Sequence, residues 1–280
     1  MDGGWAASDV AELLREPTAA DDKYSRGVLG VRTGSDGYPG AAVLGVEAAW
    51  RTGIGMVRYV GPRRAADLVL QRRPETVASE GRVQAWLIGS GTDADSRSDD
   101  ETAALRGLLA GRLPVIVDAG ALDLAPGAAA PIVVTPHARE HERLRRALRL
   151  PPPPSDRRSA AHETASALGG CVVLKGAETV VATPDGWTVT LPTATPWLAT
   201  AGTGDVLAGA IGAVVAAGAA AGPVGVERLG PLAAAAAWLH GRAAALAVEA
   251  AGGGPVTALD IATWLPHAVA SVHRYGRATA

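Results

Sequence analysis

Short apolar runs alternate with segments of helical spacing through the first half of the chain. The runs predict buried strands at Val28–Val31, Met56–Val60, Ala85–Ile88, Val115–Val117 and Ile132–Val134. Helical spacing is seen between them, at Ala41–Arg51, Ala65–Gln71 and Thr102–Leu109. This alternation is typical of a parallel sheet with helices on its faces.

The pattern changes in the second half. Three apolar runs follow one another without a helix between them, at Val172–Leu174, Thr179–Ala182 and Trp187–Leu191. Turn residues separate them, at Gly176–Ala177 and Pro184–Asp185–Gly186, which predicts a strand followed by a hairpin. Three helical segments then close the chain. The sequence therefore predicts a three-layer α/β protein with a mostly parallel central sheet.

Two segments raise the question of a membrane or of a second domain. Val206–Gly222 is long enough to span a membrane, but it is mainly Ala and Gly, which favours a buried helix. Leu232–Ala251 is interrupted by His240 and Arg242, and we expect it to be a packed helix as well. Pro151–Pro154 is either an interdomain linker or a surface loop between two helices of one domain. We favour the loop and predict an N-terminal extension, residues 1–22, followed by a single domain, residues 23–280.

Composition narrows the class of protein. Of the 280 residues, 48% are hydrophobic and 19% charged, and the net charge is −2, which excludes a disordered chain. A pI near 6.3 argues against non-specific nucleic-acid binding. The single Cys171 excludes a disulfide framework within the chain and fits a reducing cytoplasm, and Met1–Asp22 has no secretory signal pattern. Since Phe is absent, the core must be packed from small and aliphatic side chains.

The segment LATAGTGDVLAG, Leu198 to Gly209, carries the clearest sign of chemistry. Gly202 and Gly204 flank Thr203 just before a long helical pattern. Glycines allow close backbone approach, and a helix N-terminus offers unpaired N–H groups, so the segment predicts a phosphate site. Asp205 is either an ordinary first-turn acid or a base that takes a proton from an attacking hydroxyl.

Two further segments end predicted strands with polar residues. In VVLKGAET, Lys175 either extends to solvent or lies near the phosphates of a nucleotide held by the following turn. In VVTPHARE, His137 either caps a helix or faces a ligand. Ligands of parallel sheets bind outside the carboxyl ends of the strands. Asp118, Gly89–Gly91 and Gly34–Gly40 follow other strands, so the clustering of polar and small residues favours a site at this edge.

Taken together, these segments resemble the signatures of the ADP-dependent NAD(P)H-hydrate dehydratases, repair enzymes of the ribokinase-like superfamily. The resemblance rests on GSDGYPGAAVLGVEAAWRTGIGMV, IGSG, VDAGAL, TPHARE, VVLKGAET and LATAGTGDVLAG, and it spans about residues 23 to 247. AGTGD alone marks the wider superfamily of small-molecule kinases, whereas its combination with KGA-x-T, TPH-x-x-E and YPGAA is specific to the dehydratase branch.

The resemblance implies a ribokinase-like fold and a role for individual residues. Asp205 would be the catalytic base. The residues implied to bind the nucleotide are Lys175, Gly176, Ala177, Glu178, Thr179, Gly202, Thr203 and Gly204. The residues implied to bind the hydrated nicotinamide cofactor are Gly40, Ala41, Gly89, Gly91, His137 and Asp205. ADP as phosphoryl donor, Mg²⁺, hydrated NADH or NADPH as substrate and a homo-oligomer such as a tetramer are implied as well.

The chain also departs from the family pattern. Arg32–Thr33–Gly34–Ser35 stands where the family often has GGS, and Ser90 stands where it often has Pro in IGPG. Gly120 replaces the second acid of DAD-x-L, with Asp123 beyond it, and TPHARE replaces the commoner TPHPGE. Thr195–Pro196–Trp197 replaces a Gly-Asn-Pro-like lead. The chain is too short for the epimerase domain of many relatives, so we expect another protein to supply any epimerisation.

The leading hypothesis is dehydration of the S form of hydrated NADH or NADPH, driven by conversion of ADP to AMP and phosphate. One alternative is a small-molecule kinase acting on a vitamin-precursor alcohol, which would use the same base and release a stable phosphate ester. A second alternative is a non-catalytic nucleotide-sensing protein, although the Gly202–Asp205 segment argues against it, because a sensor needs no base.

Overall fold

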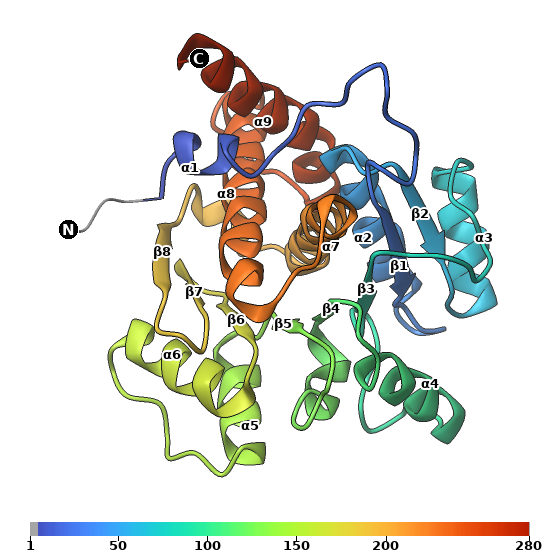
Figure 1. The fold of residues 1–280 in the computed structure, drawn as a ribbon, viewed down its shortest axis with the longest axis vertical. Coiled ribbons are helices and arrows are strands. Elements are labelled where there is room, and N and C mark those ends of the chain that lie inside the picture. The colour runs from blue at the N-terminus through green and yellow to red at the C-terminus, as the bar shows by residue number, and fades with distance from the viewer. Residues whose placement is uncertain (1–4, 280) are drawn as a thin grey trace.

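The computed structural model describes residues 5–279, with side chains as far as residue 277. Eight strands form one sheet in the order β2-β1-β3-β4-β5-β6-β7-β8 (Figure 1). The strands are β1 Val28–Arg32, β2 Met56–Tyr59, β3 Ala85–Ile88, β4 Val115–Val117, β5 Ile132–Val134, β6 Cys171–Leu174, β7 Glu178–Ala182 and β8 Thr188–Pro192. β1 to β6 are parallel, and β7 runs antiparallel to β6 and β8.

Helices cover both faces of the sheet. They are α1 Ala7–Ala11, α2 Pro39–Thr52, α3 Arg63–Arg72, α4 Asp99–Leu109, α5 Ala138–Ala147, α6 Arg157–Leu168, α7 Thr203–Ala221, α8 Val226–Ala250 and α9 Ala258–Thr279. Two short 3₁₀ helices, η1 Ala119–Leu124 and η2 Pro196–Leu198, follow β4 and precede α7. α2, α7 and α8 cover one face with α9 outside them, whereas α4, α5 and α6 lie on the other (Figure 1).

The two faces of the strands bury separate cores. Successive strand residues point to opposite sides of the sheet. In β4, Ile116 accordingly belongs to the core under α2, α7 and α8, and Val115 and Val117 belong to the core under α4, α5 and α6. The predicted three-layer architecture with a mostly parallel sheet is confirmed, as is the closing hairpin.

Small residues allow helices to pack closely over the sheet. At Gly209 of α7 an added Cβ would overlap the backbone of Gly45 in α2, so the two helices meet backbone to backbone. The Ala- and Gly-rich, Phe-free composition therefore matches a core in which helices approach closely. α7 is the one described helix long and apolar enough to cross a bilayer, and most of it is buried in the protein, as predicted.

The proline-rich stretch joins α5 to α6, and strands before and after it belong to the same sheet. Arg145, whose side chain is 1% exposed, donates through Nε to the Pro151 carbonyl at 3.0 Å. This contact fastens the loop to the body of the protein, so the stretch is a loop between helices, as favoured, and not a linker.

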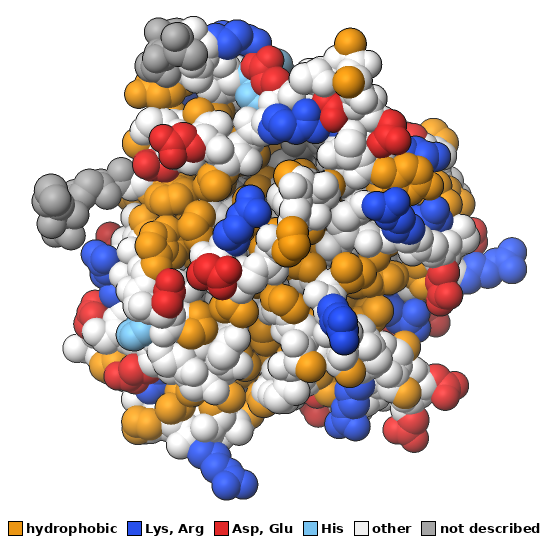
Figure 2. Space-filling view, viewed as in Figure 1, with side chains coloured by type: hydrophobic (Ala, Val, Ile, Leu, Met, Phe, Trp, Pro, Cys, Tyr) orange, Lys and Arg blue, Asp and Glu red, His pale blue; other side chains and the backbone are white. Residues whose placement is uncertain are grey.

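The N-terminal segment packs on the C-terminal helix. Val10 of α1 is fully buried, α1 contacts α9, and Arg277 pairs with Glu16 at 2.7 Å. The sequence pattern did not predict α1. On the face shown in Figure 2, Lys and Arg side chains alternate with Asp and Glu, without a broad area of one sign.

Candidate active site

Residues that follow four neighbouring strands meet at the carboxyl edge of the sheet. Asp118 follows β4, and its carboxylate accepts hydrogen bonds from Ser90 after β3 at 2.8 Å, Thr135 after β5 at 2.6 Å and Lys175 after β6 at 2.9 Å. The parallel strands end side by side, which is why residues so far apart in sequence come together. The predicted clustering at the strand ends is confirmed for this edge.

The Asp118–Lys175 pair is buried and ionised. Although burial would raise the pKa of the Asp118 carboxyl, the Lys175 ammonium and the hydrogen bonds from Thr135 and Ser90 hold it below its usual range. Burial likewise disfavours the Lys175 ammonium, but the charge and hydrogen bond of Asp118, together with the charges of Glu140 and Asp205, outweigh it and raise the pKa of Lys175. A fixed positive charge therefore lies at the end of β6.

The N-terminus of α7 lies beside this charge. Gly202 caps the helix with φ at +87°, a conformation that favours glycine. The Thr203 hydroxyl donates to the carbonyls of Leu198 and Thr200, both at 2.9 Å, and so is committed to holding the turn. A Cβ placed on Gly204 would lie 3.3 Å from Nζ of Lys175. Free N–H groups, a helix dipole and an ammonium thus converge on one spot, which suits a phosphate.

Asp205 lies in the first turn of the same helix. Burial, and then repulsion from Asp118, raise the pKa of its carboxyl to about 7, while Lys175 acts in the opposite direction. A carboxyl with such a pKa is an effective proton acceptor near neutral pH, because it takes up a proton far more readily than an ordinary carboxylate does. This raised pKa suits a base, and the role of Asp205 stays a prediction.

This pKa predicts the pH dependence of the free protein. Asp205 acts only when ionised, so kcat/KM should fall below a midpoint near pH 7 and lose about tenfold for each further pH unit. Initial rates between pH 5 and 9 provide the check. Nucleotide affinity is measured at each pH as well, so that ionisation of the nucleotide is separated from ionisation of Asp205. A rate that stays level down to pH 5 would contradict the assignment of Asp205 as the base.

The β6–β7 turn, Lys175 to Glu178, is fastened from behind. Arg157 of α6 donates to the carbonyls of Leu174, Lys175 and Glu178 at 3.1–3.2 Å. A Cβ on Gly176 would meet this guanidinium at 2.7 Å, so the side of Gly176 that a side chain would occupy faces Arg157. The exposed Gly176, Ala177 and Glu178 and the half-buried Thr179 line the open edge of the site. Their role toward the nucleotide stays a prediction.

His137 caps α5, as one of its two interpretations proposed. Its Nδ1 accepts from the Glu140 N–H at 3.4 Å, and the Glu140 carboxylate accepts from the His137 N–H at 2.8 Å. The side chain is half exposed, and its Nε2 lies 3.5 Å from the Glu140 carboxylate. Capping and ligand binding are compatible in this geometry.

Replacing His137 with alanine separates these roles. We expect KM for the hydrated cofactor to rise through loss of about 1–3 kcal/mol of hydrogen bonding, and stability to fall by about 1 kcal/mol through loss of the cap. Ser98→Ala is the matched control, because Ser98 caps α4 in the same way, accepting from Glu101 N at 3.2 Å, and does not line the cleft with Tyr38 and Glu140. If both variants change only stability, His137 does not bind the cofactor.

The remaining predicted cofactor residues divide into two groups. A Cβ on Gly91 would meet Ala41 Cβ at 2.5 Å and the Tyr38 carbonyl at 2.8 Å, and one on Gly89 would overlap the Asp118 carbonyl. Ala41, Gly89 and Gly91 thus form a close-packed floor beside Asp118. Next to it lies a cleft of about 560 Å³, lined by residues that include Tyr38, Ala119 and Glu140.

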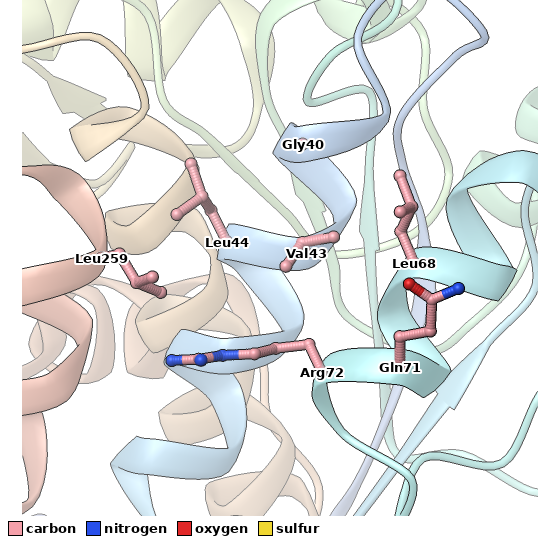
Figure 3. A pocket seen from close by; sticks show the side chains of 7 residues that line it. All are labelled: Gly40, Val43, Leu44, Leu68, Gln71, Arg72 and Leu259. Atoms are coloured by element: carbon pink, nitrogen blue, oxygen red, sulfur yellow. The ribbon is translucent and has the colours of Figure 1, made fainter.

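Gly40 lies elsewhere. It lines a shallow, mostly apolar groove of about 460 Å³ between α2, α3 and α9, where Leu44 and Leu259 face Arg72 (Figure 3). Leu44 also stands within 2.6 Å of a Cβ placed on Gly202 and so separates the groove from the α7 N-terminus. The structure does not bring Gly40 into the cleft with Tyr38 and Glu140.

Sequence reasoning missed several residues of this site. Ser90 and Thr135 were seen only as neighbours of noted residues, and His240 only as an interruption of a helix. All three are buried, and burial lowers the pKa of His240 to about 4. The position directly after a strand was the signal that would have found Ser90 and Thr135.

Within residues 5–277, no three or more His, Cys, Asp or Glu side chains are grouped to hold a metal ion. Asp118 is committed to three donors. Mg²⁺ is commonly held by substrate phosphates and water with few protein ligands, so the site fits an ion that arrives on a nucleotide.

Comparisons with known proteins agree with this geometry. Residues 29–267 match the family model described as NAD(P)H-hydrate dehydratase. Over 227 residues the chain is 47% identical to the bifunctional NAD(P)H-hydrate repair enzyme Nnr of Mycobacterium tuberculosis, covering 77% of this chain and 46% of that protein. It is 33% identical to an ADP-dependent (S)-NAD(P)H-hydrate dehydratase of Neisseria meningitidis, covering 82% of this chain and 80% of that protein.

A solved structure gives the same picture. The ADP/ATP-dependent NAD(P)H-hydrate dehydratase of Bacillus subtilis, co-crystallised with ATP and Mg²⁺, has a TM-score of 0.81 and 28% identity, covering 96% of this chain and 98% of that one. This chain has the expected ribokinase-like α/β fold. Within that class, the chain belongs to the NAD(P)H-hydrate dehydratase family.

Proposed function

We propose that this chain dehydrates the S form of hydrated NADH or NADPH and converts ADP to AMP and phosphate. The observation that carries the proposal is the position of Asp205, a carboxylate with a raised pKa in the first turn of the helix whose N-terminus faces the Lys175 ammonium. The chain spans about half the length of its bifunctional relatives, so we infer only the dehydratase activity for it.

The chemistry follows from a poor leaving group. Hydroxide leaves a carbon with difficulty, whereas a phosphate ester leaves readily. Asp205 accepts the proton of the substrate hydroxyl as that oxygen attacks the terminal phosphorus of ADP and the bond to AMP breaks. The N–H groups at Gly202–Gly204 and the Lys175 ammonium face the charge that develops on the phosphoryl oxygens. Mg²⁺, when bound with the nucleotide, neutralises phosphate charge.

The second step needs no strong acid. Phosphate departs from the ring as the nitrogen lone pair assists and the neighbouring carbon loses a proton, which restores the reduced nicotinamide. The close-packed floor formed by Ala41, Gly89 and Gly91 limits the access of water to one side of the site. The kinase alternative would stop after the first step and release a stable ester.

A spectroscopic assay tests the proposal. Hydrated NADH and hydrated NADPH lack the near-ultraviolet absorbance of the reduced cofactor, so we expect that absorbance to return when the protein and ADP are present, and not when nucleotide is omitted. Parallel reactions with ATP establish the donor. Absence of recovery with both donors and both cofactors would reject the proposal.

We further propose a cytoplasmic homo-oligomer that works beside a separate epimerase. The buried, unpaired Cys171 is compatible with a reducing compartment. The longer relatives are named bifunctional, which supports a second activity acting on the same damaged cofactor. Light scattering of the purified protein measures the oligomeric state.

A further inference from the structure

The hydrogen bonds around Asp118 have a consequence beyond binding the nucleotide. Three donors from three other strand ends converge on one carboxylate whose side chain is 3% exposed. An isolated buried carboxylate is costly, so a site retains one only if its charge is compensated. Here the compensating charge is Lys175.

Lys175 in turn interacts with three carboxylates, Asp118, Glu140 and Asp205, of which Asp118 is the one bonded to it. Its ammonium bonds to Asp118, and Asp205 also acts on its charge. Its Nζ lies against the first turn of α7, beside Gly204. A lysine side chain has four rotatable bonds, so without Asp118 its ammonium would be free to turn toward Asp205 or Glu140.

We propose that Asp118 is a positioning residue of the dehydratase reaction: it fixes the Lys175 ammonium against the first turn of α7, where the transferred phosphate binds, and withholds it from Asp205. The inference rests on the proposed function. Asp118, whose side chain is 3% exposed, acts through Lys175. The charge of Asp205 thus remains available for the hydroxyl proton.

Ser90 and Thr135 orient the Asp118 carboxylate. Thr135 bonds to Oδ1, the same oxygen that accepts from Lys175, and Ser90 bonds to Oδ2. The family often has proline where this chain has Ser90, and proline carries no side-chain donor. The Ser90 bond is therefore a feature of this chain that adds a third donor to the carboxylate.

The charged groups around the cluster are few. Asp118 and Lys175 face Asp205 from the sheet edge, and Glu140 of α5 acts on Lys175 as well. His240 of α8, buried close to Thr203, is neutral near pH 7, because burial lowers its pKa. Asp205 is therefore the group whose ionisation a change at Asp118 should move.

Asp118→Asn provides the test. We expect kcat to fall about tenfold or more as Lys175 leaves its position. With the negative charge of Asp118 gone and Lys175 free to pair with Asp205, the acidic limb of kcat/KM should move to lower pH by about one unit. Lys175→Met should move the same limb to higher pH, because it removes the positive charge that stabilises ionised Asp205. Loss of the two charges alone gives shifts of opposite sign, so the fall in kcat and in ADP affinity of Asp118→Asn, which displacement of Lys175 causes, carries the test.

Glu47→Gln is the matched control. Glu47 of α2 is a fully buried carboxylate paired with Arg73 at 2.6 Å, away from the strand edge. We expect it to lower the melting temperature and to leave the pH profile unchanged. Thr135→Val removes one donor to Asp118 and replaces Asp118→Asn as the test if that variant does not fold. The kcat of Thr135→Val should fall about twofold to tenfold.

The outcomes are separable. Opposite shifts for Asp118→Asn and Lys175→Met, together with kcat reduced about tenfold and ADP affinity reduced about fivefold or more in Asp118→Asn, support the proposal. If the wild type is active and Asp118→Asn keeps its pH profile and kcat, the positioning proposal is overturned and the proposed function stands. If Asp118→Asn does not fold, the same result with Thr135→Val overturns the positioning proposal. If the wild type is inactive, the proposed function is rejected, and calorimetry with ADP tests the positioning of Lys175. An ADP affinity reduced about fivefold or more in Asp118→Asn supports the positioning proposal. An unchanged affinity overturns it.

Discussion

Asp205→Asn should lower kcat by about 10²–10⁴-fold and leave ADP affinity nearly unchanged, because removing a general base has an effect of that size. Asparagine keeps the shape of the side chain in the first turn of α7 but accepts no proton. Turnover and calorimetric binding of ADP, measured on the same preparation, check both halves of the prediction.

The melting temperature of this variant should not fall. The folded-state pKa of Asp205 lies above the ordinary value of a carboxyl, so ionising the group disfavours the folded state once the pH exceeds that ordinary value. Asparagine removes this unfavourable term at neutral pH. Asp99→Asn is the control, since Asp99 is an exposed first-turn acid of α4 and its loss should not affect turnover. Retention of more than about a tenth of the wild-type rate in Asp205→Asn would exclude Asp205 as the base.

Gly204→Val should reduce nucleotide affinity by about 10²-fold or more. A Cβ at this position already lies 3.3 Å from the Lys175 ammonium, and two further methyl groups would fill the space between the ammonium and the N-terminus of α7. Hydrogen bonds to charged groups contribute about 1.5–3 kcal/mol each, so losing even two of them gives an effect of this size. Calorimetric titration with ADP measures it.

Gly107→Val is the control for the intrinsic effect of valine in a helix. Gly107 lies exposed in α4, and an added Cβ there meets no atom within 4 Å. Valine has a higher helix propensity than glycine, so Gly107→Val should not lose stability, and it should bind ADP as the wild type does. Equal affinities for the two variants would place the phosphate away from Gly204.

Most of the sheet could be predicted from the sequence because its strands are buried on both faces. Residues 115–117 and 132–134 are continuous β-branched runs between turn residues, and the predicted strands agree with the observed ones to within one or two residues. α5 and α6 were harder to predict. In α5, the charged residues of 138–147 leave only a narrow apolar stripe. α1 is too short for its periodicity to be recognised.

The site was predicted in part. The residues around Gly202–Asp205 and Lys175 could be found because glycine-rich turns and strand ends have local signatures. The bond between Lys175 and Asp118 could not, because it joins residues 57 positions apart and depends on the order of the strands. Gly40 was assigned to the cofactor with Ala41, but adjacent residues of α2 point in different directions, and Gly40 faces the groove with Leu44.

Stoichiometry tests the central claim most directly. Hydrated NADH of S configuration is mixed with the protein, ADP and Mg²⁺, and phosphorus NMR and near-ultraviolet absorbance are followed on the same sample. We predict that AMP, inorganic phosphate and restored NADH appear in equal amounts, and that none of them appears with Asp205→Asn. Consumption of ADP with a lasting phosphate ester and no restored NADH would contradict the account and identify the protein as a kinase.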